Sequence, residues 1–142
     1  MVNITYSNID NNFKFDQEKR FNELIQQVIE DFDLPKQDLN YIFCSDDYLY
    51  KMNVDFLEHD TYTDVITFES AHELLPSEIY ISIERITENA DKFSVPFNTE
   101  LSRVMIHGLL HLCGLNDASD DDKKVMRANE NKYLKLLRVL GA

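Results

Sequence analysis

Hydrophobic and polar residues alternate along the chain in a way that predicts four strands and five helices. Four short runs are rich in β-branched, aromatic and aliphatic residues and end at polar or turn-forming segments, which is typical of strands. They are residues 2–7 (VNITYS), 38–44 (DLNYIFC), 63–68 (TDVITF) and 78–82 (EIYIS). Elsewhere, hydrophobic residues recur every three or four positions, which is the spacing of an amphipathic helix.

The predicted helices follow from that spacing and from residues that commonly begin a helix. Their expected starts are Asp16, Ser45 or Asp46, Ile83, Asn98 and Ser119. Asp120, Asp121 and Asp122 in the first turn of the last helix complement its dipole. The order is βαβαββααα, with no repeat, linker or change of composition. We therefore expect one α+β domain that covers residues 1–142.

The most informative stretch is the hydrophobic run from Val104 to Cys113, whose only two polar side chains are His107 and His111. A helix that is hydrophobic on all sides belongs in the interior of a protein. Histidines four residues apart lie on one helical face, with Cβ atoms about 5–6 Å apart. That spacing lets both rings bind one metal ion at about 2.0–2.1 Å. The pattern therefore predicts two metal ligands on a buried helix.

A third ligand follows this helix. Gly114 is the expected left-handed residue that ends it, and the turn brings the carboxylate of Asp117 back towards the histidines. The alternative is that His107 and His111 are core residues that bond to the backbone. Each imidazole left unpaired in the core would cost about 1–3 kcal/mol, and a metal ion removes much of that cost. We therefore expect His107, His111 and Asp117 to form a metal site.

Length and composition restrict the class of protein. With 142 residues, of which 44% are hydrophobic, the chain can bury a sizeable core. No hydrophobic run reaches the roughly 18 residues of a membrane span, and residues 1–13 lack the features of a signal peptide. Cys44 and Cys113 form neither a CxxC motif nor a disulfide framework. A reducing cytoplasm is therefore the expected location.

The net charge of −12 argues against simple binding of free nucleic acid, because such proteins usually carry a basic surface. Basic residues nevertheless gather in the last helix. A helical wheel separates four of them from an apolar side, with Lys124, Arg127, Lys135 and Arg138 opposite Met126, Tyr133, Leu137 and Leu140. Alone, this pattern predicts an ordinary amphipathic surface helix. His59 and His72 lie in separate loops without ligand spacing, and we expect both to be exposed to solvent.

Three segments also carry a resemblance to known proteins. HGLLHLCGLND (His107–Asp117) is similar to the motif H-G-x-L-H-L-x-G-Y-D-H. MNVDFLEHDTYTDVITF (Met52–Phe68) is similar to L-N-x-x-Y-R-x-K-D-x-P-T-D-V-L-S-F, and SEIYIS (Ser77–Ser82) resembles the strand G-D-I-x-I-S. All three motifs, in this order and at these distances, resemble the YbeY family of metal-dependent endoribonucleases over about residues 46–133.

The resemblance implies a small α+β domain, with a mixed four-stranded sheet packed against helices and a zinc site beside the central helix. It also implies a single-strand endoribonuclease that acts in 3′-end maturation of 16S ribosomal RNA and in ribosome quality control. The family's first two zinc ligands match His107 and His111, and its third histidine falls at Asp117. A carboxylate also binds zinc, at about 2.0–2.2 Å. We therefore expect one zinc ion per chain.

The sequence departs from the family's motifs at several positions. The family's arginine aligns with Leu57, its lysine with His59, its proline with Tyr62 and its Gly-Asp pair with Ser77-Glu78. If that arginine binds phosphate, another cation must replace it here. The candidates, which the sequence does not rank, are Arg103, Lys92 and the basic side of the last helix with Lys124 and Arg127.

A site with three protein ligands leaves a fourth position for water, whose pKa zinc lowers from 15.7 towards about 7. We expect that water to attack an RNA phosphodiester, and we assign no catalytic side chain. A zinc peptidase is the first alternative, although the general base of its HExxH motif is replaced by Gly108. A ribosome-assembly factor with a structural zinc is the second. Because the chain is acidic, we expect ribosomal RNA to be presented within ribosomal particles or by a partner factor.

Overall fold

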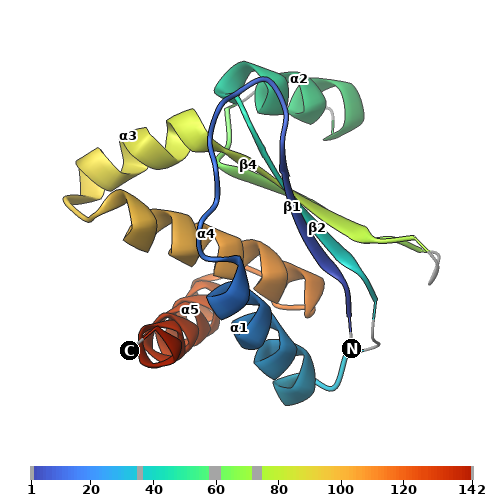
Figure 1. Ribbon diagram of the computed structural model, residues 1–142, viewed down its shortest axis with the longest axis vertical. Helices are drawn as coiled ribbons and strands as arrows, with labels where there is room; N and C mark the ends of the chain where they lie inside the picture. Colours follow the sequence, from blue (N-terminus) through green and yellow to red (C-terminus); the bar gives the residue numbers. More distant parts are fainter. Residues whose placement is uncertain (1, 35–36, 58–61, 72–74, 142) are drawn as a thin grey trace.

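The computed structural model describes residues 2–34, 37–57, 62–71 and 75–141. Its elements follow the predicted order (Figure 1): β1 (Ile4–Asn8), α1 (Glu18–Asp31), β2 (Leu39–Cys44), α2 (Asp46–Leu57), β3 (Val65–Phe68), β4 (Ser77–Ser82), α3 (Ile83–Phe93), α4 (Phe97–Leu112) and α5 (Asp120–Leu140). His59 and His72 lie outside the described residues. Within the described part, no helix is long and apolar enough to cross a lipid bilayer.

The four strands form one mixed sheet in the order β1-β2-β4-β3. β1, β2 and β4 are parallel, whereas β3 pairs antiparallel to β4, with Val65 opposite Ile81. The mixed four-stranded sheet is therefore confirmed. Because β3 is an edge strand, one of its sides remains open beside α4.

The two faces of the sheet are covered unequally. Tyr41 and Phe43 of β2 point into a large core that is shared with α1, α3, α4 and α5. On the other face, Cys44 and Ile66 pack against Leu49 of α2 in a smaller cluster. Figure 1 shows α2 apart from the other helices, at one end of the sheet. This alternation along β2 is the expected pattern for a strand that is covered on both faces.

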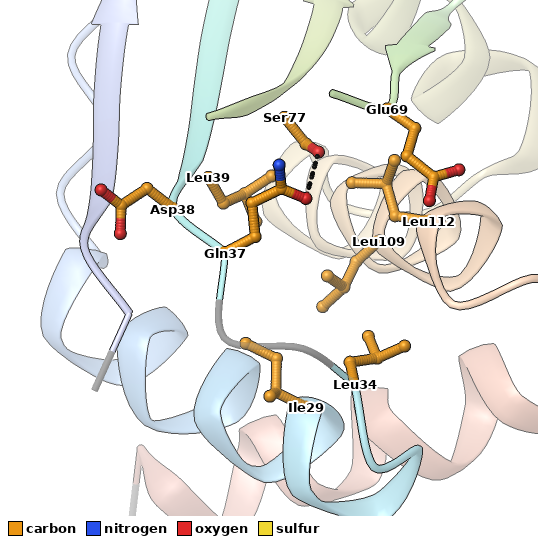
Figure 2. Close-up of a pocket in the computed structure, with 9 residues that line it drawn as sticks. All are labelled: Ile29, Leu34, Gln37, Asp38, Leu39, Glu69, Ser77, Leu109 and Leu112. Carbon is orange, nitrogen blue, oxygen red and sulfur yellow. Dashed lines mark hydrogen bonds between the residues drawn. The ribbon is translucent and has the colours of Figure 1, made fainter. Parts of the chain in front are cut away.

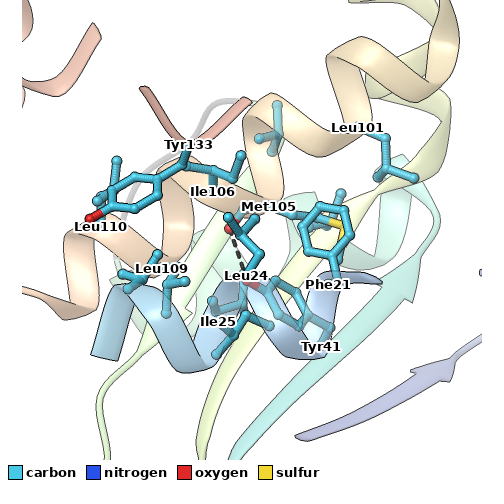
Figure 3. Packing of buried hydrophobic residues seen from close by; sticks show 14 of the residues in the cluster. Phe21, Leu24, Ile25, Tyr41, Leu101, Met105, Ile106, Leu109, Leu110 and Tyr133 are labelled. Carbon is cyan, nitrogen blue, oxygen red and sulfur yellow. Dashed lines mark hydrogen bonds between the residues drawn. The ribbon is translucent and has the colours of Figure 1, made fainter. Parts of the chain in front are cut away.

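α4 lies at the centre of the large core, and nine of its 16 residues are buried (Figure 3). The hydroxyl of Tyr41 donates a hydrogen bond to the carbonyl oxygen of Met105 over 2.9 Å, which attaches the helix to β2. Gly108 faces the sheet so closely that a Cβ atom there would lie 2.9 Å from Cγ2 of Ile79. The prediction of a buried central helix is confirmed.

The helix starts are partly as predicted. The Ser119 hydroxyl accepts from the backbone N–H of Asp122 in a full capping box, as expected. By contrast, α1 begins after Gln17 instead of Asp16, without a side-chain cap. α4 begins after Pro96, whose carbonyl oxygen accepts from the N–H of Glu100, so Asn98 lies inside the first turn and is not the cap. Proline supplies the extended backbone that a helix start needs, and asparagine is then not required.

Candidate metal centre

The end of α4 brings the three predicted ligands together. Nε2 of His107 lies 2.9 Å from Nε2 of His111, and Oδ2 of Asp117 lies 3.4 Å and 3.6 Å from these two atoms. One ligand atom from each of the three residues lies within 4.8 Å of the others, which makes the cluster a candidate metal site. The two rings are partly buried, whereas 48% of the Asp117 side chain is exposed.

The turn after α4 explains how Asp117 reaches the histidines. The N–H of Gly114 donates to the carbonyl oxygen of His111, and the N–H of Leu115 donates to that of Leu110. These two bonds define a Schellman motif, which requires a left-handed residue after the helix. Gly114 adopts a φ of 95°, as the sequence predicted. The chain therefore reverses within three residues and returns the carboxylate to the face of His107 and His111.

The hydrogen bonds of the two rings leave both Nε2 atoms free for a metal. Nδ1 of His107 lies 2.7 Å from Oε2 of Glu130, and Nδ1 of His111 lies 2.9 Å from the carbonyl oxygen of Leu115. A carboxylate and a carbonyl only accept, so both Nδ1 atoms carry the proton. In neutral rings the two Nε2 lone pairs then face each other across 2.9 Å. A cation between them relieves this repulsion, so the donor set fits a metal ion.

Glu130 of α5, which accepts a hydrogen bond from Nδ1 of His107, is a residue of the site that the sequence analysis did not identify. Its side chain is only 3% exposed and accepts from His107 and, over 3.2 Å, from Nη1 of Arg103. Arg103 is in turn paired with Glu100, which is also buried. Partners of this kind orient a ligating imidazole and raise its basicity. A buried chain of charges thus extends from the first turn of α4 to the metal cluster.

The electrostatics of Glu130 favour its ionised form. Burial alone would raise the pKa of this carboxyl. The hydrogen bond from His107 and the adjacent Arg103 guanidinium outweigh burial and hold the pKa below its usual value. Glu130 is therefore a carboxylate at neutral pH, and it can only accept from Nδ1 of His107.

The three clustered residues open onto a cleft with a volume of about 670 Å³. Its two sides come from different parts of the chain. We call the side with His107, His111 and Asp117 the histidine wall. A second group of lining residues, here called the tyrosine wall, belongs to α2 and to the segment that leads into β3, namely Asn53, Leu57, Tyr62, Thr63 and Asp64. No lysine or arginine lines the cleft among the residues that the structure describes.

Asp64 is the ionisable group of the tyrosine wall whose pKa is displaced. Burial raises its pKa above the usual value, and the neighbouring His107 and Arg103 offset only part of that effect. Thr63, the residue before Asp64, lines the same cleft.

A second hollow, lined by residues of α1, of β2 and of the last turn of α4, has a different character (Figure 2). Its volume is about 100 Å³, and leucine and isoleucine side chains form most of its lining. At its rim, the Ser77 hydroxyl donates to Oε1 of Gln37 over 3.3 Å. Asp38 points away from it in Figure 2. Without a converging set of ligands, this hollow offers no comparable chemistry.

The structure also ranks the cations that were considered as substitutes for the family's arginine. Arg103 is 18% exposed and is engaged by Glu100 and Glu130, so it supports the site from behind. Lys92 lies next to Phe93 at the end of α3. Arg127 is 61% exposed, and its Nη1 lies 3.6 Å from Oε1 of Glu130. Of these cations, Arg127 is the best placed to reach a phosphate near the histidine wall.

Comparison with known proteins agrees with this geometry. The family model described as Endoribonuclease YbeY matches residues 3–138. The endoribonuclease YbeY of Flavobacterium psychrophilum is 47% identical over 133 residues, which cover 93% of this chain and 95% of that protein. That of Amoebophilus asiaticus is 43% identical over 142 residues, covering 99% and 97%.

A solved structure supports the same conclusion. The solution structure of a Thermotoga maritima protein is similar with a TM-score of 0.60 and 29% identity, and the match covers 96% of this chain and 89% of that one. The fold, the cluster at the end of α4 and the family match agree with one another. The chain therefore belongs to the YbeY family of endoribonucleases, metal-dependent enzymes that hydrolyse phosphodiester bonds in RNA.

Proposed function

We propose that the chain is a zinc-dependent, single-strand endoribonuclease of the cytoplasm that acts in 3′-end maturation of 16S ribosomal RNA and in ribosome quality control. Its metal ligands are His107, His111 and Asp117. The observation that carries the proposal is the pair of Nε2 atoms 2.9 Å apart, with both Nδ1 atoms engaged by acceptors. Family membership supports hydrolysis of RNA as the reaction, and this pair of atoms supports the end of α4 as the metal site.

Zinc is the metal that this donor set suits best. Two imidazoles and one carboxylate form a known set for catalytic zinc, which keeps a fourth position open. Magnesium and calcium prefer sites built mainly from oxygen ligands. When bound, such a metal polarises a phosphoryl oxygen and supplies an activated water at neutral pH. The open cleft beside the cluster leaves room for a strand of RNA to approach.

The chain's own residues prepare that reaction. Glu130 and the carbonyl of Leu115 hold the two rings in the tautomer that presents Nε2 to the cleft. Asp64, with its raised pKa, is the carboxyl on the tyrosine wall that most readily holds a proton. Arg127 is an exposed cation whose Nη1 lies 3.6 Å from Oε1 of Glu130.

Two alternative functions have less support. A zinc peptidase of the HExxH type carries a glutamate directly after the first histidine, where this chain has Gly108. A Cβ atom at that position would collide with Ile79, so the helix has no room for such a side chain. A structural zinc is normally held by four protein ligands, and the cluster contains three among the described residues.

The experiment that tests the proposed function combines metal analysis with RNA cleavage. We expect purified protein to contain about one zinc per chain and to cleave single-stranded RNA. His111→Ala and Asp117→Ala should lose both properties, whereas Asp121→Ala, an exposed aspartate in the first turn of α5, should keep them. Cleavage that persists in His111→Ala, or in protein stripped of metal, would contradict the proposal.

Chelation separates catalysis from structure. The core is built from apolar contacts and does not include the metal cluster. We therefore expect metal removal to abolish cleavage while the far-UV circular dichroism spectrum stays unchanged. A structural zinc predicts the opposite, because activity would then disappear together with the fold.

The charge of the protein indicates how its RNA substrate reaches the cleft. The net charge is −12, and the described lining of the cleft contains no lysine or arginine, so attraction to free RNA is weak. We infer that ribosomal RNA is presented within ribosomal particles or by a partner factor. Mapping of 16S 3′ ends in a deletion strain tests this role. Tight binding of the isolated protein to free RNA at physiological salt would contradict presentation by a partner.

A further inference from the structure

The tyrosine wall carries an aromatic ring that is held in place and yet open to the cleft. Tyr62 stacks on Tyr50 with ring centroids 4.4 Å apart and an interplanar angle of 23°. The guanidinium carbon of Arg85 lies 5.5 Å from the Tyr62 centroid, and Arg85 is itself fixed by Asp46 over 2.7 Å. Despite these contacts, 52% of Tyr62 is exposed. The ring is therefore pre-positioned but not covered.

The surroundings of Tyr62 continue this apolar surface. Leu57, at the end of α2, also lines the cleft and is 39% exposed. Phe56, next to it, is 68% exposed and contacts Phe68 edge to face. Leu57 and Tyr62 thus expose apolar surface in the cleft that contains His107 and His111.

The charges of the cleft decide what this surface can bind. Asp64 and Asp117 line it, and no lysine or arginine does so within the described part of the chain. Contacts to phosphate therefore contribute little affinity on this side. A nucleobase is neutral, and aromatic rings bind bases by stacking with little dependence on sequence. Single-stranded RNA, whose bases are unstacked, is the form in which a base can reach such a ring.

We propose that Tyr62 is a base-stacking subsite, which receives the nucleobase of a nucleotide next to the bond that is cut and so selects single-stranded RNA. This inference rests on the proposed nuclease function and deepens it. The histidine wall acts on the phosphodiester, and the tyrosine wall holds the neighbouring base. Stacking on a ring that Tyr50 already orders costs little side-chain entropy.

The test compares three variants in metal-loaded protein. Tyr62→Leu removes the aromatic ring and keeps an apolar side chain, whereas Tyr62→Phe keeps the ring. Phe93→Leu is the matched control, because Phe93 is 54% exposed at the end of α3 and does not line the cleft. Single-turnover cleavage of a single-stranded oligonucleotide gives the half-saturating protein concentration and the maximal rate separately.

We expect Tyr62→Leu to raise the half-saturating concentration about tenfold, a typical effect of losing one stacked base. Tyr62→Phe and Phe93→Leu should stay within about twofold of the unaltered protein. The zinc content of Tyr62→Leu should be unchanged, because Tyr62 is not part of the metal cluster.

A substrate with a single abasic nucleotide provides the decisive readout. For the unaltered protein, the half-saturating concentration should rise about tenfold when the abasic position is next to the cleavage site. For Tyr62→Leu, the same change of substrate should leave the half-saturating concentration as it is. If Tyr62 had a purely structural role, the effect of Tyr62→Leu and the effect of the abasic nucleotide would multiply. That result would overturn the proposal of a base-stacking subsite. Unchanged kinetics of Tyr62→Leu on every substrate would also overturn it, although cleavage itself would still support the nuclease. Absence of cleavage by the unaltered, zinc-loaded protein would instead remove the proposed function and the subsite together.

Discussion

The histidine wall and the tyrosine wall face the same cleft but are built by different means. On the histidine wall, both imidazoles are fixed at Nδ1, and Glu130 behind them is nearly inaccessible to solvent. On the tyrosine wall, Tyr62 and Leu57 expose large apolar surfaces to the cleft. The histidine wall is carried by α4, the central helix of the hydrophobic core. The tyrosine wall is carried by α2 and by the segment that leads into the edge strand β3.

This difference shows how the fold separates two requirements. Metal ligands must keep their mutual geometry within a fraction of an ångström, and burial with satisfied hydrogen bonds provides that rigidity. A surface that accepts many nucleobases needs an open ring and few specific polar contacts. Changes on the histidine wall should therefore alter metal binding, and changes on the tyrosine wall should leave metal binding as it is.

The largest effect is expected from Glu130→Ala. Loss of the acceptor for Nδ1 of His107 releases the ring and leaves Arg103 with one carboxylate fewer, so zinc affinity should fall about 10- to 100-fold. Glu130→Gln keeps an acceptor oxygen for the imidazole and should lose less. Competition with a chromophoric chelator measures both affinities.

Glu88→Ala is the control for this experiment, because Glu88 is 71% exposed and, within the described part of the chain, forms its ion pair with Arg85 and not with the metal cluster. It should bind zinc as the unaltered protein does. Equal zinc affinity of Glu130→Ala and Glu88→Ala would show that the histidine wall needs no support from α5, and the contrast between the two walls would disappear.

A smaller effect is expected from Gly108→Ala. The added methyl group would meet Cγ2 of Ile79 at 2.9 Å and Cγ2 of Val65 at 3.3 Å, so α4 must move away from the sheet. The free energy of unfolding should fall by about 1–3 kcal/mol, and zinc binding should weaken because His107 and His111 move with the helix. Urea denaturation measures the first effect.

Gly114→Ala separates packing from backbone strain. Nothing lies within 4 Å of a Cβ atom at this position, but its φ is 95°. The expected cost is about 1 kcal/mol, from the left-handed backbone alone. If Gly108→Ala were no more destabilising than Gly114→Ala, the close approach of α4 to the sheet would not be what positions the histidine wall.

The smallest effect is expected from Asp64→Asn on the tyrosine wall. In metal-free protein the pKa of Asp64 is raised by burial, so its stabilising contribution is complete at acidic pH and is lost as the pH rises through the folded-state pKa. At pH 7 the buried carboxylate therefore lowers stability. Asparagine should raise the melting temperature by about 2–4 °C and flatten its dependence on pH, as differential scanning calorimetry would show.

Asp55→Asn, at an exposed position of α2, serves as the comparison for this change. It should leave the melting temperature and its pH dependence as they are. A melting temperature of Asp64→Asn that is unchanged at pH 7 would contradict a cost from burial of the Asp64 carboxylate.

Much of this fold follows from local patterns in the sequence. α3 occupies the predicted residues 83–93, because the apolar spacing and the cap at Ser82 agree. The ligand cluster was also predictable, since His107, His111, Gly114 and Asp117 lie within 11 residues, where helix geometry and a Schellman turn fix their positions. Such features depend on interactions between near neighbours.

The features that the sequence did not reveal depend on contacts between distant segments. Glu130 is 23 residues from His107, and only the packing of α5 against α4 brings them together. A signal was nevertheless present, because Glu130 falls on the same buried side of α5 as Met126 and Tyr133. A charged residue on an apolar helical face calls for a buried partner. The pairing of Tyr62 with Tyr50 has no such local sign.

The hydrogen bond from Tyr41 to the carbonyl oxygen of Met105 has a consequence for metal selectivity. It fixes the axial position of α4 on β2, and a shift of one turn would displace His107 by about 5.4 Å. The acceptors at both Nδ1 atoms hold the two imidazoles at a fixed spacing on that helix. Asp117, beyond the end of the helix and 48% exposed, is the proposed ligand that is free to adjust. Replacement of zinc by a larger divalent ion should accordingly displace the aspartate and leave the ring pair where it is.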